Sequence, residues 1–134
     1  MSIENFRAGV TQALVDWHQA NYPTIDIAFE NGPVPDQNKV SSPWLDVELR
    51  MYSGNSLGVG GPKAGRYTGT VAVRCFTKAG EGTALADAIL DSLDKTLSGL
   101  RVAGGVLEFP DPMMPVTALG WYKRGLMFPF RVDV

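Results

Sequence analysis

Two alternating segments on either side of a glycine-rich stretch are the feature that most limits how this chain can fold. Leu45 to Tyr52 and Tyr67 to Cys75 each place apolar side chains at every second position, which is the pattern of a strand with one face on a core. The stretch from Ser53 to Gly65 holds five glycines and one proline in thirteen residues. We therefore predict a long β-hairpin with a mobile tip that does not pack against its own sheet.

Two other segments repeat apolar residues at steps of three and four, which predicts helices over residues 3–20 and 84–98. Tyr22–Pro23 ends the first helix, because the residue before a proline is kept out of the helical region. Gly99 follows the second helix at the position of a C-terminal cap. The apolar positions are Ile3, Phe6, Val10, Leu14 and Trp17 in the first helix and Leu85, Ile89, Leu93 and Leu97 in the second.

Prolines limit the strands of the C-terminal third. Val102 and then residues 106–109 are apolar enough for a short strand. It should end at Pro110, because this proline and the two that follow it, Pro112 and Pro115, interrupt pairing. The alternating segment 126–134 is predicted as the last strand. It contains Pro129, which favours a sheet edge or a bulge.

The order of these elements predicts the fold class. Ile25 to Phe29 alternates and is predicted as a strand, and the proline-rich segment 31–43 after it is predicted as a surface loop. The order is then helix, strand, strand, strand, helix, strand, strand. We predict a single α+β domain over residues 1–134, in two layers, with both helices on one face of a mostly antiparallel or mixed sheet.

The charge balance argues against several classes of function. Twelve Lys and Arg against fourteen Asp and Glu give a net charge of −2, without the concentrated basic charge of a protein that binds DNA or anionic membranes non-specifically. No apolar run of 18 residues is present, and the N-terminus lacks the pattern of a secretory signal. We expect synthesis and folding in the cytoplasm and no membrane partner.

The residue types that carry much of catalytic and metal chemistry are scarce. His18 and Cys75 are the sole histidine and the sole cysteine, which excludes a His-rich metal site, a Cys-rich zinc cluster and an intramolecular disulfide. We interpret His18, near the end of the first helix, as structural or solvated. Cys75 shares a strand register with Val71 and Val73 and is interpreted as a small buried hydrophobe.

Three aspartates on the second predicted helix suggest a metal or acid–base site. Asp87, Asp91 and Asp94 are spaced i, i+4 and i+7 and share one helix face. The apolar positions lie across the helix from them. We therefore interpret the aspartates as the solvated side of an amphipathic helix, with a subunit contact as the alternative.

The glycine-rich stretch does not match a phosphate-binding loop. Pro62 before Lys63 and Ala64 after it break the Walker pattern, and the stretch joins two strands instead of a strand and a helix. The sequence of this stretch is equally compatible with an inert loop and with a segment that becomes ordered when a partner binds.

A second apolar sheet face is predicted from side chains on the register opposite the core. Tyr52, Phe76 and Met127 occupy such positions. Helices can cover one face in a chain of this length, and neighbouring copies can cover the other, which favours an oligomer. The residues predicted to contact partners are Tyr52, Gly54, Leu57, Gly58, Val59, Gly60, Lys63, Arg66 and Phe76.

Several short sequences between residues 3 and 98 are distinctive when taken together. The most distinctive is Phe29-Glu30-Asn31 followed by the proline-rich turn. The others are Trp17, Tyr22-Pro23, Pro43-Trp44-Leu45-Asp46-Val47, Gly69-Thr70-Val71-Ala72-Val73-Arg74-Cys75 and Gly80-Glu81-Gly82. Over roughly residues 3–98 the chain resembles phage minor tail proteins of the tail-terminator type, in particular prophage-encoded members.

The resemblance implies a structural protein of the virion tail, assembled in the bacterial host cytoplasm, which is not an enzyme and needs no cofactor. It would form a six-membered ring on the finished tail tube. Its implied partners are further copies of itself in the virion, the tail tube protein and the head connector, with DNA only passing through the lumen. The resemblance also allows a monomer in free solution. The alternatives are another head–tail connector, such as a stopper or completion protein, and a small-ligand or enzymatic domain that uses Asp87, Asp91 or His18.

Overall fold

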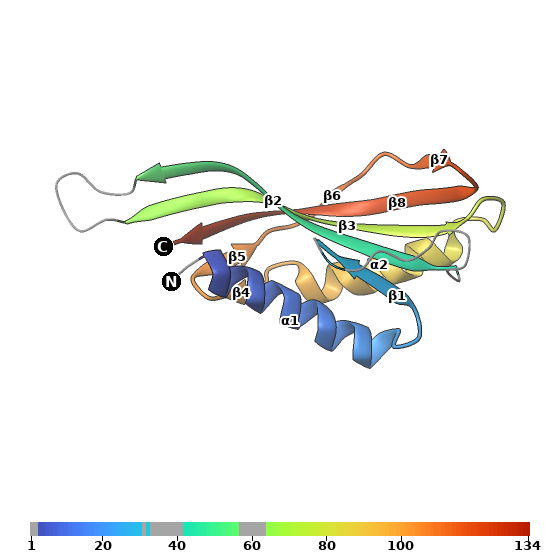
Figure 1. Cartoon of the computed structure of the whole chain (residues 1–134), viewed down its shortest axis with the longest axis horizontal. Coiled ribbons are helices and arrows are strands. Elements are labelled where there is room, and N and C mark those ends of the chain that lie inside the picture. Colours follow the sequence, from blue (N-terminus) through green and yellow to red (C-terminus); the bar gives the residue numbers. More distant parts are fainter. Residues whose placement is uncertain (1–2, 31, 33–41, 57–63) are drawn as a thin grey trace.

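A computed structural model describes residues 3–30, 32, 42–56 and 64–134. Two helices, α1 (Ile3–Asn21) and α2 (Ala84–Leu97), lie on one face of a mixed sheet, and no helix lies on the other face within the described residues (Figure 1). The predicted α+β class, with both helices on one face of the sheet, is confirmed. Gly99, at a φ of 78°, follows the last turn of α2 as a left-handed cap, as predicted.

The sheet has eight strands in the described part of the chain, in the spatial order β1-β2-β3-β8-β5-β4, with β6 and β7 also paired to β8. β1 is parallel to β2, and the other pairs are antiparallel. The prediction of five strands missed three very short ones, β4, β6 and β7. The bounds are β1 Asp26–Phe29, β2 Trp44–Ser56, β3 Gly65–Lys78, β4 Arg101–Val102, β5 Gly105–Leu107, β6 Asp111–Pro112, β7 Val116–Ala118 and β8 Trp121–Asp133.

The hairpin of β2 and β3 is longer than predicted. Its ladder runs from the pair Trp44 and Phe76 to the pair Ser56 and Gly65, so the prediction that Ser53 to Gly65 is an unpaired tip was wrong at both ends. Once the partner strand is in register, small polar residues and glycines form backbone hydrogen bonds as other residues do. Residues 57–63 lie outside the described part of the chain. Figure 1 shows the paired strands extending well past the helices.

A bulge interrupts the hairpin ladder at Tyr52. Met51 pairs with Gly69 and Ser53 with Thr68, which leaves Tyr52 as the extra residue. A Cβ atom on Gly69 would lie 1.9 Å from the carbonyl oxygen of Arg50. A glycine is therefore required where β3 passes the bulge.

Pro129 lies inside the sheet and not at its edge. β3 flanks β8 on one side, and β5 and β6 flank it on the other. The carbonyl of Pro129 accepts the backbone N–H of Glu108, so the proline nitrogen faces the same side, where the register shifts by one residue between β5 and β6. The expected bulge thus lies in the segment opposite the proline, at the point where a missing N–H costs least.

Two further expectations for this region were wrong. The predicted strand 106–109 ends at Leu107, and Phe109 is exposed. Pairing resumes beyond Pro110, because Asp111 and Pro112 align with Met127 and Leu126 of β8. A proline blocks only the hydrogen bond that its own nitrogen would donate, and the other groups of a short strand can still pair.

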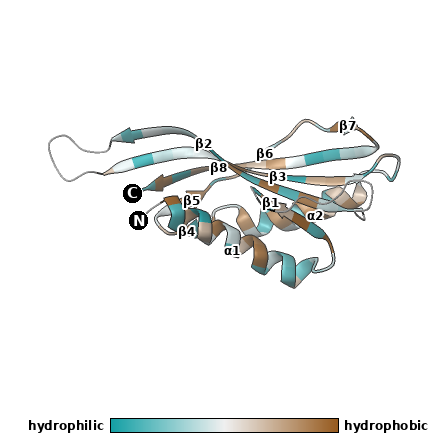
Figure 2. Ribbon diagram, viewed as in Figure 1, coloured by the Kyte–Doolittle hydropathy of each residue, from teal (hydrophilic) through white to brown (hydrophobic). Residues whose placement is uncertain are grey.

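The main core lies between the helices and the sheet. Phe6, Leu14 and Phe128 are fully buried there. Figure 2 shows hydrophobic residues concentrated where the sheet covers the helices, whereas the ends of β2 and β3 beyond them are mostly hydrophilic. Leu85, predicted as part of the apolar side of α2, is exposed. The buried face of α2 is instead formed by Ala86, Ile89, Leu90, Leu93 and Leu97.

Candidate interaction surface

The sheet face turned away from the helices is the candidate site, and we call it the outer face. Because the odd positions of β3, such as Val71 and Val73, lie in the main core, its even positions point to the outer face. The same alternation assigns the even positions of β2 and the odd positions of β8 to it. Its side chains include Trp44, Asp46, Glu48 and Arg50 of β2, Thr70, Arg74 and Phe76 of β3, and Trp121, Lys123, Met127, Arg131 and Asp133 of β8.

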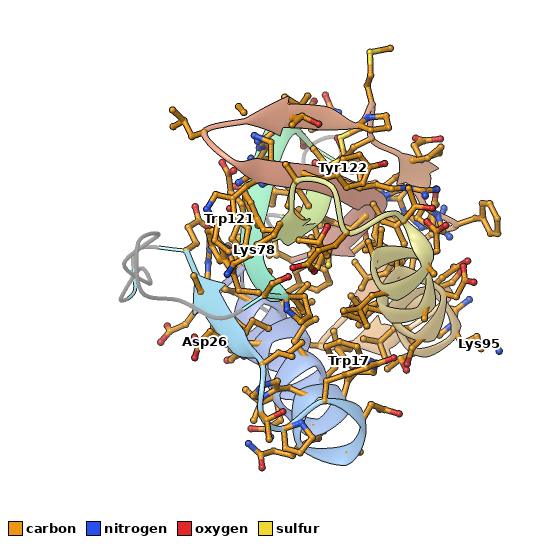
Figure 3. The ribbon with its side chains drawn as sticks, turned by 90° about the vertical axis from the view of Figure 1, so that its right-hand side faces the viewer. Trp17, Asp26, Lys78, Lys95, Trp121 and Tyr122 are labelled. Atoms are coloured by element: carbon orange, nitrogen blue, oxygen red, sulfur yellow. The ribbon has the colours of Figure 1, made fainter. Side chains whose placement is uncertain are left out.

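An aromatic cluster occupies one end of the outer face. The rings of Trp44 and Phe76 stack with centroids 3.9 Å apart, and Trp121 meets Trp44 edge-on at 6.1 Å. The ammonium of Lys123 lies 5.9 Å from the Phe76 centroid. Of the residues predicted to form a second apolar face, Phe76 packs in this small cluster, whereas Tyr52 is exposed and Met127 lies outside it. Figure 3 shows Trp121 and Lys78 at this end of the molecule.

A row of ion pairs continues from this cluster toward the hairpin. Arg74 Nε donates to Asp46 at 2.7 Å, and Glu48 accepts from Arg50 at 3.0 Å and from Arg74 at 3.4 Å. The hydrogen bond from Arg50 lowers the pKa of Glu48, although partial burial opposes the shift. These charge-assisted bonds link β2 to β3 and hold their polar side chains in fixed positions.

Tyr52 ends this row at the bulge. Its hydroxyl lies 3.1 Å from Thr70 Oγ1, and hydrogen bonds with Thr70 and then Arg50 lower the pKa of Tyr52. The ring itself is exposed to solvent. The bulge therefore presents an aromatic side chain outward while its polar tip is fixed.

Three arginines line a hollow at the opposite end of the outer face, which we call the arginine hollow. Arg66 donates two hydrogen bonds to the carboxylate of Asp133, of 2.7 and 3.1 Å. Arg101, Arg131 and the turn between β4 and β5 complete the lining. The hollow has a volume of about 350 Å³. The bond from Arg66 lowers the pKa of Asp133, and the charge of Arg131 adds to the shift. Arg101 and Arg131 form no ion pair with any described residue.

Exposed apolar side chains follow the segment from β5 to β8, which we call the apolar arm. Phe109, Met114 and Leu119 are 77%, 86% and 91% exposed. Leu119 and Gly120 form a two-residue turn with φ values of 53° and 81°, a geometry that favours Asn-Gly. A large apolar side chain is thus held in the left-handed region and in solvent. We did not predict this feature, although Leu-Gly before an alternating segment is its sequence signal.

Comparisons with known proteins identify the fold of this chain and no family. No family model matches the chain, and no curated protein matches it. Sixteen chains of solved structures match it. One of them, whose name carries no functional information, superposes with a TM-score of 0.75 over 98% of this chain and 96% of its own, at 19% sequence identity. This likeness shows the fold alone.

The predicted partner-contacting residues do not form one site. Tyr52, Gly54 and Arg66 lie toward the projecting end of the hairpin, whereas Phe76 lies in the aromatic cluster at its other end. Gly54 has a structural reason to be glycine, because a Cβ there would lie 2.8 Å from the ring of Tyr67. Leu57, Gly58, Val59, Gly60 and Lys63 lie outside the described residues.

The candidates for catalytic chemistry take part in structural contacts. His18 Nε2 lies 2.7 Å from the carbonyl of Ile25, so it links α1 to the residue just before β1. Cys75 is fully buried, and burial raises the pKa of its thiol to about 12. Asp87 pairs with Arg124 of β8. In the part of the chain that the structure describes, no three His, Cys, Asp or Glu side chains are grouped to hold a metal ion, and no helix there is long and apolar enough to cross a membrane.

Glu30, from the most distinctive piece of the resemblance, fixes the edge of β2. Its carboxylate accepts the backbone N–H of Leu49 at 3.2 Å and pairs with Arg7 of α1 at 2.5 Å. One side chain thus satisfies a strand edge just beyond β1 and ties that edge to a helix.

Proposed function

We propose that this protein is a structural subunit of a phage tail that caps the tail tube as a six-membered ring, ends tube elongation and forms the joint to the head connector. The observation that carries the proposal is the outer face, which has no described helix on it, exposed apolar side chains along its rim and a hairpin that projects past the helices. Such surfaces are typical of protein contacts. The sequence resemblance over roughly residues 3–98 gives the kind of assembly.

A closed ring requires a contact between two different patches on adjacent copies, with a rotation that returns to the first copy. In this proposal the hairpin contributes to the ring face that matches the tube, because it reaches beyond the body of the subunit. The opposite ring face lacks the edges of a tube subunit and does not accept another ring. Elongation therefore stops because the two ring faces differ.

DNA passes through the lumen of such a ring without being retained. A chain with a net charge of −2 suits a bore that must not hold a polyanion. The protein thus acts through its surfaces, and the proposal assigns it no reaction.

Electron microscopy of the purified protein mixed with tail tubes tests the proposal. The tubes are polymerised from the tube protein encoded by the same genome. We expect a ring of six copies at one end of each tube and no further growth from that end. A ring that binds the head connector but not the tube would support the stopper or completion alternative. No association with either would refute the proposal.

A shortened hairpin tests the role assigned to the hairpin. Deletion of Gly54 to Gly65 should remove tube capping while circular dichroism shows a folded protein. A matched variant, Tyr52→Ser, keeps the hairpin length and removes only the exposed ring at the bulge. If tubes still end at normal length with the deletion variant, the role of the hairpin is contradicted, whereas the proposal of a capping ring is not.

A further inference from the structure

We propose that the arginine hollow of one copy receives the acidic side of α2 from the next copy, through Asp91 and Asp94. This rests on the proposed function, which requires a head-to-tail contact between copies. The partner of the hollow is thus a pair of carboxylates on a helix of a second copy of this chain.

Within the described part of the chain, the positive charge of the hollow is only partly neutralised. Arg66 is already occupied by the fork onto Asp133, whereas Arg101 and Arg131 form no ion pair with a described residue. The pairing of Arg131 with Val106, and of Val106 with Arg101, places both arginines in one row across β8, β5 and β4. Their Cα atoms are about 10 Å apart, since adjacent strands lie about 4.8 Å apart. Two flexible guanidinium groups can therefore converge on one acidic segment.

The solvent side of α2 offers the complementary charge. Asp87 is paired with Arg124, but Asp91 and Asp94 form no ion pair with a described residue. They are three positions apart, so they lie on the same helix face with Cβ atoms about 5–6 Å apart.

The two patches lie far apart on the molecule. The hollow is on the outer face beside β4, β5 and the end of β8, whereas α2 is on the helix side and extends toward the other end of the sheet (Figure 1). One copy therefore presents a basic patch and an acidic patch to two different neighbours. A contact between unlike patches is heterologous and forms a closed ring when its rotation closes. Complementary charge of this kind also sets the register and suppresses wrong pairings.

A nucleic acid fits the hollow less well than a carboxylate pair. The carboxylate of Asp133 lies inside it, and Asp111 and Glu108 hold register positions on the same sheet face. Binding to the DNA backbone needs an extended array of unneutralised cations. Arg101 and Arg131, which form no ion pair with a described residue, provide only enough positive charge for a short acidic protein segment.

Charge reversal with rescue tests the contact. Three variants are compared with the parent protein. The first combines Arg101→Glu and Arg131→Glu, the second combines Asp91→Lys and Asp94→Lys, and the third carries all four changes. Sedimentation velocity at low ionic strength should show self-association of the parent protein that weakens with salt. The association constant of each double variant should be lower than that of the parent protein by a factor of about ten or more. The fourfold variant, and an equal mixture of the two double variants, should recover association.

A matched control separates the patch from net charge. Asp16→Lys with Asp26→Lys makes the same charge change as the α2 variant at exposed positions outside the patch, and should associate like the parent protein. Loss of rescue in the mixture, a parent protein that stays monomeric, or salt-sensitive binding of duplex DNA through Arg101 and Arg131 in place of self-association would each overturn the inference.

Cysteine cross-linking gives a second measurement. With Arg131→Cys and Asp91→Cys in one Cys75→Ala chain, oxidation should give a ladder of species beyond the dimer, whereas each single change should give dimers at most. A ladder with no capping of tail tubes would refute the proposed function and keep the contact. Normal capping by the two charge-reversed double variants would refute the contact and keep the function.

Discussion

Trp17 Nε1 on α1 donates a hydrogen bond of 2.9 Å to Ser92 Oγ on α2. Both groups lie where the two helices meet beneath the sheet, and the Trp17 ring is buried (Figure 3). A buried N–H without a partner would cost about 1–3 kcal/mol, so this bond helps to fix how α1 sits against α2.

We expect the Trp17 and Ser92 side chains to be energetically coupled. Trp17→Phe removes the donor together with some packing, and Ser92→Ala removes the acceptor and leaves the indole N–H unpaired. A double-mutant cycle in urea should give a coupling free energy of about 1 kcal/mol, because it cancels the packing loss. Additive effects of the two changes would contradict the bond.

Gly69→Ala should strongly lower the free energy of unfolding. The new Cβ atom would lie 1.9 Å from the Arg50 carbonyl oxygen, and that atom belongs to the backbone. We expect a loss of about 3 kcal/mol. Gly65→Ala is the control, since its Cβ would lie 3.4 Å from the nearest atom and should change stability little. Equal effects at both positions would show that the bulge can relax.

Leu119→Asn should stabilise the protein. Leu119 is held at a φ of 53°, where an ordinary side chain costs about 1–2 kcal/mol and Asn costs less. Thermal unfolding should show a gain of about 1 kcal/mol. Ala103→Asn, in the matching turn between β4 and β5 at a φ of 45°, should show a similar gain. No gain at either turn would contradict this account of backbone strain.

Stability should fall at high pH because of Cys75. Burial raises the pKa of this thiol from 9.0 to about 12, so it stays protonated in the folded protein at a pH where the unfolded chain ionises. The thiol's contribution is complete below pH 9 and is lost as the pH rises toward 12, at about 1.4 kcal/mol per pH unit.

Urea unfolding across this pH range, with Cys75→Ala as the reference, isolates the effect of the thiol. Lysines and tyrosines titrate in both proteins, so the difference between the two curves reports Cys75. A difference that does not vary with pH would contradict the buried thiol.

The helices and the main core could be predicted because each follows from a local pattern. Phe6, Val10, Leu14 and Trp17 are all buried as their spacing indicates. The extended pairing of Ser53 to Ser56 could not be predicted from local pattern, since these residues have weak strand preference and pair only because β3 lies beside them. Pairing at Pro112 was missed for the same reason.

The candidate surface was predictable only in part. The opposite register of Phe76 indicated a second apolar face. The contact between Trp44 and Trp121 in that face depends on how β2, β3 and β8 align. The fork between Arg66 and Asp133 joins residues 67 positions apart, and a single sequence has no local signal for such a pair. Exposure of Leu119 was not predicted, because it depends on the turn between β7 and β8, which was not predicted either.

β8 has the central place in the sheet, because β3 pairs along one side of it and β5, β6 and β7 along the other. Until β8 is synthesised, the side of β3 that β8 occupies carries unpaired backbone groups. A strand from another chain could pair with that edge before β8 does.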